Sequence, residues 1–242
     1  MAMFVAKTCG PLHEVEEFTR MLAGAEVNVA IGLKRLGHSV AYVTKLGTDP
    51  FGTYIENKLK AEGLDVQISK DEDHFTGYQL KGKVMEGDPE VFYYRRNSAA
   101  SCLSVEDIEK VDLEGARVLH ITGIPPALSK SCRKATYRLI ERAREKNMLV
   151  SFDPNLRPTL WESQEVMIET INDIASRADI VLPGPAEGKI LMGSDKPEEI
   201  AEFYRKNGAK AVIIKAGGAG AYADWEDGKA FYPGYKVKEV VD

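Results

Sequence analysis

The chain has 242 residues, of which 44% are hydrophobic and 29% charged, and its formal net charge is −5. This balance is typical of a soluble globular protein with one large α/β domain or two small ones. The excess of acidic residues argues against general nucleic-acid binding, which needs a basic face. No apolar run approaches the roughly 20 residues that span a membrane, and the first residues lack the basic segment of a signal peptide, so we expect a cytoplasmic protein.

Cysteine and histidine spacing gives no sign of a metal centre. The three cysteines are odd in number and form no C-x-x-C pair, which indicates a reducing compartment and argues against a disulfide framework or a zinc site. The four histidines also lack ligand spacing, and we interpret most of them as surface or packing residues: His13, His38, His74 and His120.

Strands and helices alternate over the first third of the chain. A short strand is predicted over Met3–Ala6, followed by a helix over 22–37 that Gly37 closes. A strand over 40–46 comes next, and then a helix over 51–63. The first helix is expected to pack through Val29, Leu33 and Leu36.

Residues 75–96 interrupt this alternation. Apolar and polar residues alternate from Tyr78 to Val84, which is the period-2 pattern of a half-exposed strand. Glu86–Pro89 forms a turn signal, and a second strand follows over 91–96. The pattern predicts an inserted hairpin that acts as a lid.

The rest of the chain returns to alternating strands and helices. Ser104 with Asp107 three residues later is a capping signal for a short helix, and Ser129 can cap the helix that follows it. Strands are predicted over 117–122, 149–152, 180–182 and 211–215, and helices over 129–146, 163–178, 187–192 and 197–207. Three short strands end the chain, over 222–225, 229–233 and 236–241. Such alternation predicts βαβ units and a mainly parallel sheet.

A cluster of polar residues follows the strand over 149–152. Asp153, Pro154, Asn155 and Arg157 suit no strand interior, and ligands of open α/β sheets bind beyond the carboxyl ends of the strands. A structural turn needs the proline and the asparagine but gives no reason for an arginine. The cluster therefore predicts a ligand site.

Two earlier motifs are open to more than one interpretation. Ala23–Asn28 starts a helix, where glycine and free N–H groups suit a ligand, but a tight helix start with a capping acid has the same residues. Tyr93–Arg96 combines aromatic and arginine side chains on alternating faces of the lid, which fits either an anion clamp or an exposed edge strand.

The glycine-rich run Lys215–Gly220 follows a strand. Gly218-x-Gly220-x-x-Ala223 matches a relaxed dinucleotide fingerprint, but that motif needs a following helix and here a strand and a turn follow. A loop whose backbone lies against nucleotide phosphates remains an open interpretation.

Taken together, these segments resemble the PfkB, or ribokinase-like, carbohydrate kinases. The resemblance rests on AGAEVNVAIGLKRLG, YVTKLGTDPFG, FYYRRNSAAS, FDPNLRPTLW, LPGPAEGKILMG and VIIKAGGAGAY in the family order. It implies an α/β fold, a three-layer sandwich with a mainly parallel sheet and a small β-lid. It also implies one kinase domain over 1–242, incomplete at the C-terminus and clipped in its first strand, with lid strands near 11–20 and 75–97.

The resemblance implies phosphoryl transfer from ATP, with Mg²⁺, to a primary hydroxyl of a sugar acid. The pattern is most similar to a 2-keto-3-deoxygluconate kinase, which forms the 6-phosphate. We expect an acid rather than a neutral sugar, because a neutral sugar would leave Arg95 without an anionic partner. A fructokinase and a catalytically inactive sugar-binding protein are the alternatives. The resemblance and the open hairpin also suggest a homodimer through the lid strands, with neither nucleic acid nor membrane as a partner.

Site residues follow from the matched motifs. The sugar site is implied to consist of Gly24, Ala25, Glu26, Val27, Asn28, Tyr78, Tyr93, Tyr94, Arg95, Ile124 and Arg157. The nucleotide site is implied to consist of Asn155, Leu156, Arg157, Lys215, Gly217 and Gly220. Arg157 serves both the sugar carboxylate and the transferring phosphate, and Glu187 supports Mg²⁺ through water.

Two departures from the family pattern concern catalysis. The family's Asn-x-x-Glu reads Gly184-Pro-Ala-Glu187, so a side-chain amide is missing. The Gly-Ala-Gly-Asp element, whose aspartate is the general base, does not occur in the sequence. Either the chain is part of a longer enzyme or it binds a sugar without phosphorylating it. In both cases we expect Asp153 to shape its turn and to support Mg²⁺ indirectly rather than to act as the base.

Overall fold

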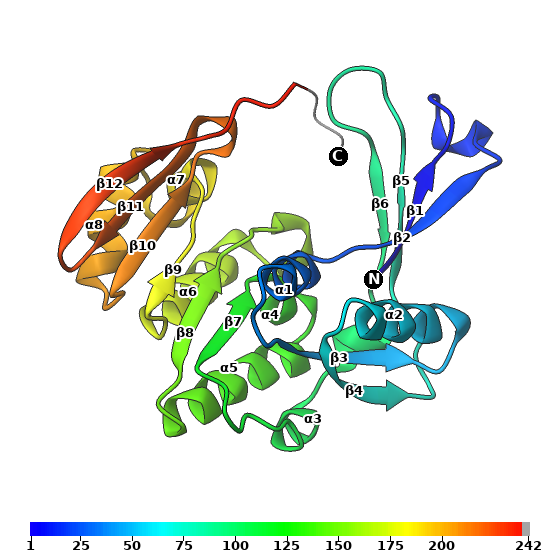
Figure 1. The fold of residues 1–242 in the computed structure, drawn as a ribbon, viewed down its shortest axis with the longest axis horizontal. Helices are drawn as coiled ribbons and strands as arrows, with labels where there is room; N and C mark the ends of the chain where they lie inside the picture. Colours follow the sequence, from blue (N-terminus) through cyan, green and yellow to red (C-terminus); the bar gives the residue numbers. More distant parts are fainter. Residues whose placement is uncertain (239–242) are drawn as a thin grey trace. The chain divides into compact units, whose positions relative to one another are not determined.

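The structure, a computed structural model, describes residues 1–238 of the chain. It divides into two compact units, Met1–Asp112 and Leu113–Asp242. The first unit contains the predicted lid and the second contains the larger sheet (Figure 1). The single kinase domain over 1–242 stays a prediction.

A four-stranded sheet, here called the lid sheet, forms one part of the first unit. Its strand order is β2 (Phe18–Leu22), β1 (Ala2–Ala6), β5 (Tyr78–Lys81) and β6 (Val91–Tyr94). Strands β5 and β6 pair antiparallel, so the predicted hairpin is confirmed. The lid strand predicted near 11–20 lies later in the chain, as β2, and a short 3₁₀ helix at 12–14 precedes it.

The remainder of the first unit packs two helices with a parallel pair of strands. Helix α1 (Ala25–Arg35) and helix α2 (Pro50–Ala61) accompany strands β3 (Ala41–Gly47) and β4 (Asp65–Asp71). Helix α2 begins after Asp49, whose carboxylate accepts the N–H groups of the first turn. The shared core consists of Val27, Ala30, Leu46, Ile55, Leu59 and Leu64.

The predicted packing face of α1 is wrong. Val29 and Leu33 are both more than a third exposed, and Leu36 is 76% exposed, whereas Val27 and Ala30 are buried. Both sets recur at helical spacing, so periodicity alone does not say which stripe faces the core.

The second unit is built on a six-stranded sheet. Three neighbouring strand pairs are parallel and the two at one edge are antiparallel, so the mainly parallel sheet is confirmed. The order is β12 (Gly228–Pro233), β11 (Gly220–Trp225), β10 (Ala211–Lys215), β9 (Ile180–Val181), β8 (Leu149–Asp153) and β7 (Val118–Thr122).

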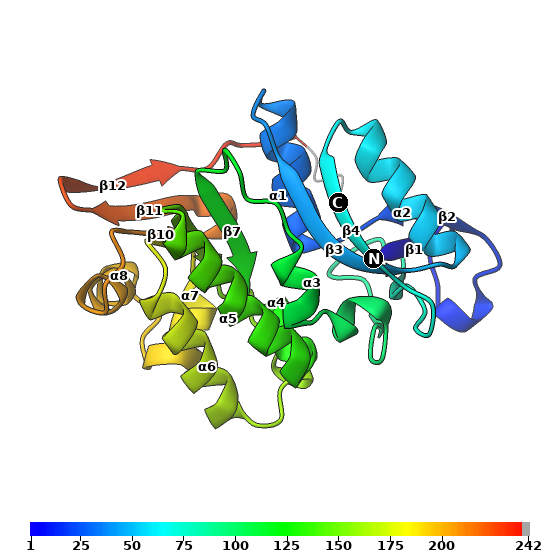
Figure 2. The same cartoon turned by 90° about the horizontal axis from the view of Figure 1, so that it is seen from below.

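Among the described residues, this unit contains five α-helices. They are α4 (Ile124–Leu128), α5 (Lys130–Glu145), α6 (Gln164–Ser176), α7 (Pro185–Met192) and α8 (Pro197–Lys206). Helix α5 packs against β7 and β8, and α8 packs against β10 and β11. Figure 2 shows α5 and α6 on the same face of the sheet. The core here includes Val150, Phe152, Ile171, Ile174, Val181, Ile200, Tyr204, Val212 and Ile214.

The two predicted helix caps are confirmed. Ser104 and Asp107 form the capping box of α3 (Val105–Glu109), and the Ser129 hydroxyl accepts the N–H of Cys132 at the start of α5. Of the strand predicted over 236–241, residues 236–238 are not strand and 239–241 lie outside the described residues. Within the described part of the chain, no helix has the length and apolar character needed to cross a membrane.

Asp179 is a buried charge that ties three segments of the second unit together. Its carboxylate accepts the N–H of Val150 at 2.8 Å and pairs with Arg144 at 2.6 Å and Lys210 at 2.9 Å. Burial alone would raise the pKa of Asp179, but these hydrogen bonds and charges outweigh it and hold the pKa below its usual range. The ionised form therefore stabilises the folded unit.

We expect Asp179→Asn to lower the free energy of unfolding at pH 7 by about 2–3 kcal/mol, because hydrogen bonds to a charged group are lost. The folded pKa lies below the unfolded value of about 3.9, so this stabilisation is present above that pH and disappears as the pH falls through the folded pKa. The loss measured by urea unfolding should therefore shrink in acid. Glu202→Gln, which breaks an exposed pair with Lys206, should change stability little at any pH; equal losses in both variants would contradict the prediction.

Candidate functional site

In the first unit, the start of helix α1 presents backbone donors. Gly24 supplies no capping side chain, and the first N–H groups of a helix have no partner within it. Asn28 is exposed and Glu26 is half-buried in the first turn, whereas the Val27 side chain is 2% exposed and belongs to the core. The side chain of Val27 is therefore out of reach of a ligand, and only its backbone can make a contact.

The two faces of the lid sheet separate the predicted lid residues. Tyr78 pairs with Tyr94 and their rings stack with centroids 4.7 Å apart, so both side chains lie on one face. Tyr93 lies on the other face, with the Arg95 guanidinium 4.3 Å from its ring centre. A ligand on the face of Tyr93 and Arg95 does not meet the side chains of Tyr78 and Tyr94.

Gln79 is a residue that sequence reasoning missed. The register places it opposite Tyr93, and directly paired residues share a face, so its amide lies on the same face as Arg95. Gln79 and Arg95 are 8% and 7% exposed, respectively, an unusual degree of burial for polar side chains. Alternation along β5 predicts that Gln79 and Tyr78 lie on opposite faces, but only the register with β6 shows which of the two shares a face with Tyr93 and Arg95.

Backbone hydrogen bonds connect the lid sheet with the start of α1. The N–H of Ala23 donates to the Met1 carbonyl at 3.0 Å, and the adjoining strand β1 pairs with β5 of the lid sheet. The helix start, Tyr93, Arg95 and Gln79 are therefore the polar groups that the first unit offers to a ligand.

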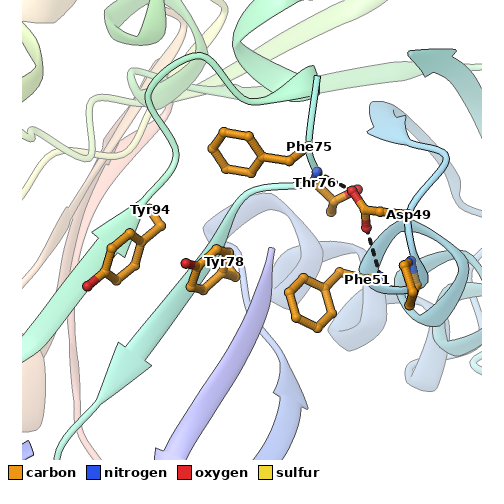
Figure 3. A pocket seen from close by; sticks show the side chains of 7 residues that line it. Asp49, Phe51, Phe75, Thr76, Tyr78 and Tyr94 are labelled. Atoms are coloured by element: carbon orange, nitrogen blue, oxygen red, sulfur yellow. Dashed lines mark hydrogen bonds between the residues drawn. The ribbon is translucent and has the colours of Figure 1, made fainter. Parts of the chain in front are cut away.

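The opposite face of the lid borders a cavity of about 350 Å³ (Figure 3). Tyr78, Tyr94, Phe51 and Phe75 line it, and the Phe51 and Tyr78 rings lie 5.7 Å apart. Asp49 is the carboxylate in the lining, and its oxygens already accept the N–H groups of Phe51, Gly52 and Thr76. This cavity is largely aromatic, with its acid engaged in holding the backbone.

In the second unit, the loop after β8 has a fixed shape. Asp153 Oδ1 accepts the N–H of Asn155 at 3.1 Å, and Asn155 has a φ of 39°, a left-handed conformation that asparagine tolerates well. Arg157 follows, with Nη1 donating to the Leu156 carbonyl at 2.8 Å. Among residues 1–238, Arg157 has no carboxylate partner.

Glu187 joins this loop to the start of helix α7. Its Oε1 accepts the N–H of Leu156 at 2.8 Å, and its Oε2 accepts the N–H of Gly184 at 2.7 Å. Each oxygen keeps a further lone pair for another donor. The missing asparagine side chain at Gly184 leaves this backbone bond intact.

The loop after β10 is tied to the loop after β8. Lys215 Nζ lies 2.6 Å from Asp153 Oδ1, and the Lys215 N–H donates to the Pro183 carbonyl beyond β9. Gly217 and Gly220 both have positive φ, and strand β11 begins at Gly220 and runs antiparallel to β10. The prediction that no helix follows this glycine run is confirmed.

Ile124 lies at the neighbouring strand end. Its N–H donates to the Thr122 hydroxyl, and the Gly123 N–H donates to the Asp153 carbonyl at 2.9 Å. A Cβ on Gly123 would lie 2.1 Å from the Pro154 carbonyl oxygen, so only glycine allows the loops after β7 and β8 to approach this closely. The ends of β7, β8, β9 and β10 therefore form one connected edge.

This edge can bind an anion. Arg157 and Lys215 supply two cations, and the glycine loop supplies backbone N–H groups at the carboxyl ends of parallel strands, where α/β sheets bind ligands. The edge lies within the second unit and contains the residues predicted for the nucleotide, whose role stays a prediction.

Known proteins similar to this chain are sugar kinases. The model of the pfkB family carbohydrate kinases matches residues 1–242. A 2-dehydro-3-deoxygluconokinase of Bacillus subtilis (strain 168) is 48% identical over 244 residues, covering 100% of this chain and 75% of the relative.

Solved structures similar to this chain lead to the same family. A PfkB protein from Polaromonas sp. JS666 has 47% identity and a TM-score of 0.93, covering 98% of this chain and 81% of that one. A sugar kinase of Pyrococcus horikoshii in complex with ATP has 25% identity and a TM-score of 0.80, covering 98% and 76%. The ribokinase-like fold is confirmed, and the chain belongs to the pfkB family of carbohydrate kinases.

Proposed function

We propose that the protein phosphorylates a sugar acid, 2-keto-3-deoxygluconate, at its primary hydroxyl, using ATP. The observation that carries the proposal is Arg157, a guanidinium without a carboxylate partner among residues 1–238, in a loop fixed by Asp153 and Glu187. A planar cation held in this way suits a bidentate carboxylate or phosphate. The name of the Bacillus subtilis relative supports the choice of acid.

We assign residues of each unit, taken separately, to contacts with the sugar. A buried Arg95 beside Tyr93 and Gln79 offers a cation, an aromatic ring and an amide to an acid with several hydroxyls. The proposed contacts are Gly24, Ala25, Glu26, Val27 through its backbone, Asn28, Gln79, Tyr93, Arg95, Ile124 and Arg157. Tyr78 and Tyr94 line the aromatic cavity of the other lid face, and we assign them to support of the lid.

We assign the phosphates to the strand-end loops of the second unit. Phosphoryl transfer depends mainly on positioning and on charge stabilisation, and the donor set of cations and backbone N–H groups fits phosphate. The proposed nucleotide contacts are Asn155, Leu156, Arg157, Lys215, Gly217 and Gly220. The neighbour solved with ATP supports this use of the fold.

The carboxylates of the same loops fit a magnesium ion held through water. Both oxygens of Glu187 accept backbone N–H groups and retain lone pairs for water, and Asp153 pairs with Lys215. When bound, Mg²⁺ neutralises charge on the transferring phosphate.

We further propose a cytoplasmic homodimer that uses the lid, with neither nucleic acid nor membrane as a partner. Strand β6 is an edge of the lid sheet, and Phe92, Tyr93 and Tyr94 on it are each 45–50% exposed. An exposed aromatic edge strand favours pairing with a second chain.

The test is ATP consumption by the full-length protein with 2-keto-3-deoxygluconate, fructose and ribose. We expect kcat/KM to be highest for the sugar acid. Preference for fructose would reassign the protein as a fructokinase. Binding of a sugar without ATP consumption would identify a catalytically inactive binding protein.

A further inference from the structure

Two segments connect the lid hairpin to the rest of the first unit, and they lie side by side. Residues 72–77 lead from β4 into β5, and residues 95–98 lead from β6 into a 3₁₀ helix, Ala99–Cys102. The N–H of Ala99 donates to the Phe75 carbonyl at 2.9 Å, which joins the two segments. Any ligand that bridges them would restrain the hairpin.

Three metal-ligating side chains converge at this junction. Asp71 ends β4, His74 lies in the incoming segment, and Cys102 ends the 3₁₀ helix after the outgoing segment. One donor atom of each lies within 4.8 Å of the others. The Cys102 thiol is free of any disulfide, so all three donor types (oxygen, nitrogen and sulfur) are available.

Hydrogen bonds already orient two of the donors. Asp71 Oδ1 lies 3.0 Å from His74 Nδ1 and also accepts the N–H groups of Asp73 and His74. The Asp71 side chain is 6% exposed and that of His74 is 39% exposed. The junction is therefore ordered on the side of the aspartate and open to solvent on the side of the histidine.

The charge of the junction favours a cation. Lys45 Nζ pairs with Asp107 at 3.0 Å and lies 3.8 Å from Asp71 Oδ2, so one ammonium faces two carboxylates. The two carboxylates thus outnumber the single ammonium at the junction.

We propose that Asp71, His74 and Cys102 form a binding site for a zinc-like divalent transition metal, which links the two segments connecting the lid hairpin. Carboxylate, imidazole and thiolate are all zinc ligands, and three protein ligands leave a fourth position for water on the exposed side. Binding releases the thiol proton to solvent. Mg²⁺ prefers oxygen ligands and does not compete for a thiolate.

The site would act on the position of Arg95. This residue lies in the outgoing segment, and the segments are packed so closely that a Cβ on Gly77 would lie 3.4 Å from Arg95 Cβ. A metal that fixes the segments to each other restrains the hairpin at its base. This inference does not rest on the proposed sugar acid, because metal binding is measured without any sugar.

The experiment titrates Co²⁺ into the chelator-treated full-length protein, with Mg²⁺ present. We expect one equivalent to produce the near-ultraviolet thiolate-to-cobalt charge-transfer band, which added Zn²⁺ abolishes. Cys102→Ser should lose the band, and His74→Asn should weaken Co²⁺ affinity by roughly 10–100-fold. Hydrogen exchange over residues 72–77 and 95–102 should slow in the presence of Zn²⁺.

Cys9→Ser is the matched control, because Cys9 is exposed and lies outside the junction. It should keep the band at full intensity. Absence of the band in the unmodified protein, or its persistence in Cys102→Ser, would overturn the proposal. Should Cys102→Ser fail to fold, His74→Asn decides: unchanged Co²⁺ affinity in that variant would equally reject the site.

Discussion

Replacing Arg157 with methionine is expected to lower the kcat/KM of the full-length enzyme for the sugar acid by roughly 10²–10³-fold, the usual cost of removing one donor to developing charge. Methionine keeps an unbranched side chain of similar length but removes the guanidinium. We expect kcat to fall as well as KM to rise, because Arg157 is proposed to contact both the sugar carboxylate and the transferring phosphate. Arg157→Lys should recover part of the loss, since it restores the charge without the planar fork.

Arg117→Met is the control for this variant. Arg117 is exposed and precedes β7 at the amino end of the strand, away from the strand-end loops. Its replacement should leave both kcat and KM unchanged. A loss of less than threefold in Arg157→Met, with an unchanged melting temperature, would remove Arg157 from the site and with it the main support for an anionic substrate.

Elements that depend on residues close together in the chain could be predicted from the sequence. Ser104 and Ser129 were predicted as caps and both accept N–H groups at helix starts, because a capping bond spans only three residues. The hairpin of β5 and β6 was predicted from alternation and a turn signal. Parallel strands followed from the repeated strand and helix pattern.

The orientation of those elements was harder to predict. Val29 and Leu33 have the spacing of a packing stripe, yet the buried stripe of α1 contains Val27 and Ala30. In the lid, the register pairs Gln79 rather than Tyr78 with Tyr93. A slip of one residue moves every side chain of a strand to the other face, so the sequence alone left the choice open.

Contacts between segments far apart in the chain could not be predicted from the sequence either. The Lys215–Asp153 pair spans 62 positions, and Glu187 reaches the N–H of Leu156 from 31 residues away. Asp71, His74 and Cys102 have no motif spacing, which is why the sequence argued against a zinc site, yet folding brings their donor atoms within 4.8 Å. Such contacts depend on topology rather than on residue spacing along the chain.

The lid offers a matched pair of arginines with which to test the preference for an acid. Arg95 is 7% exposed and lies over the Tyr93 ring, whereas its neighbour Arg96 is exposed. If Arg95 binds the carboxylate in the ground state and the transition state alike, its loss raises KM without changing kcat. This behaviour distinguishes Arg95 from Arg157.

We therefore expect Arg95→Met to raise the KM for 2-keto-3-deoxygluconate by roughly 10–100-fold, since hydrogen bonds to charged groups contribute about 1.5–3 kcal/mol. The KM for ATP should stay unchanged, and any turnover of fructose should be affected far less. Arg96→Met should match the unmodified enzyme with every substrate. Equal losses with the acid and with fructose would mean that Arg95 supports the lid without binding the carboxylate, and the sugar-acid preference would then rest on Arg157 alone.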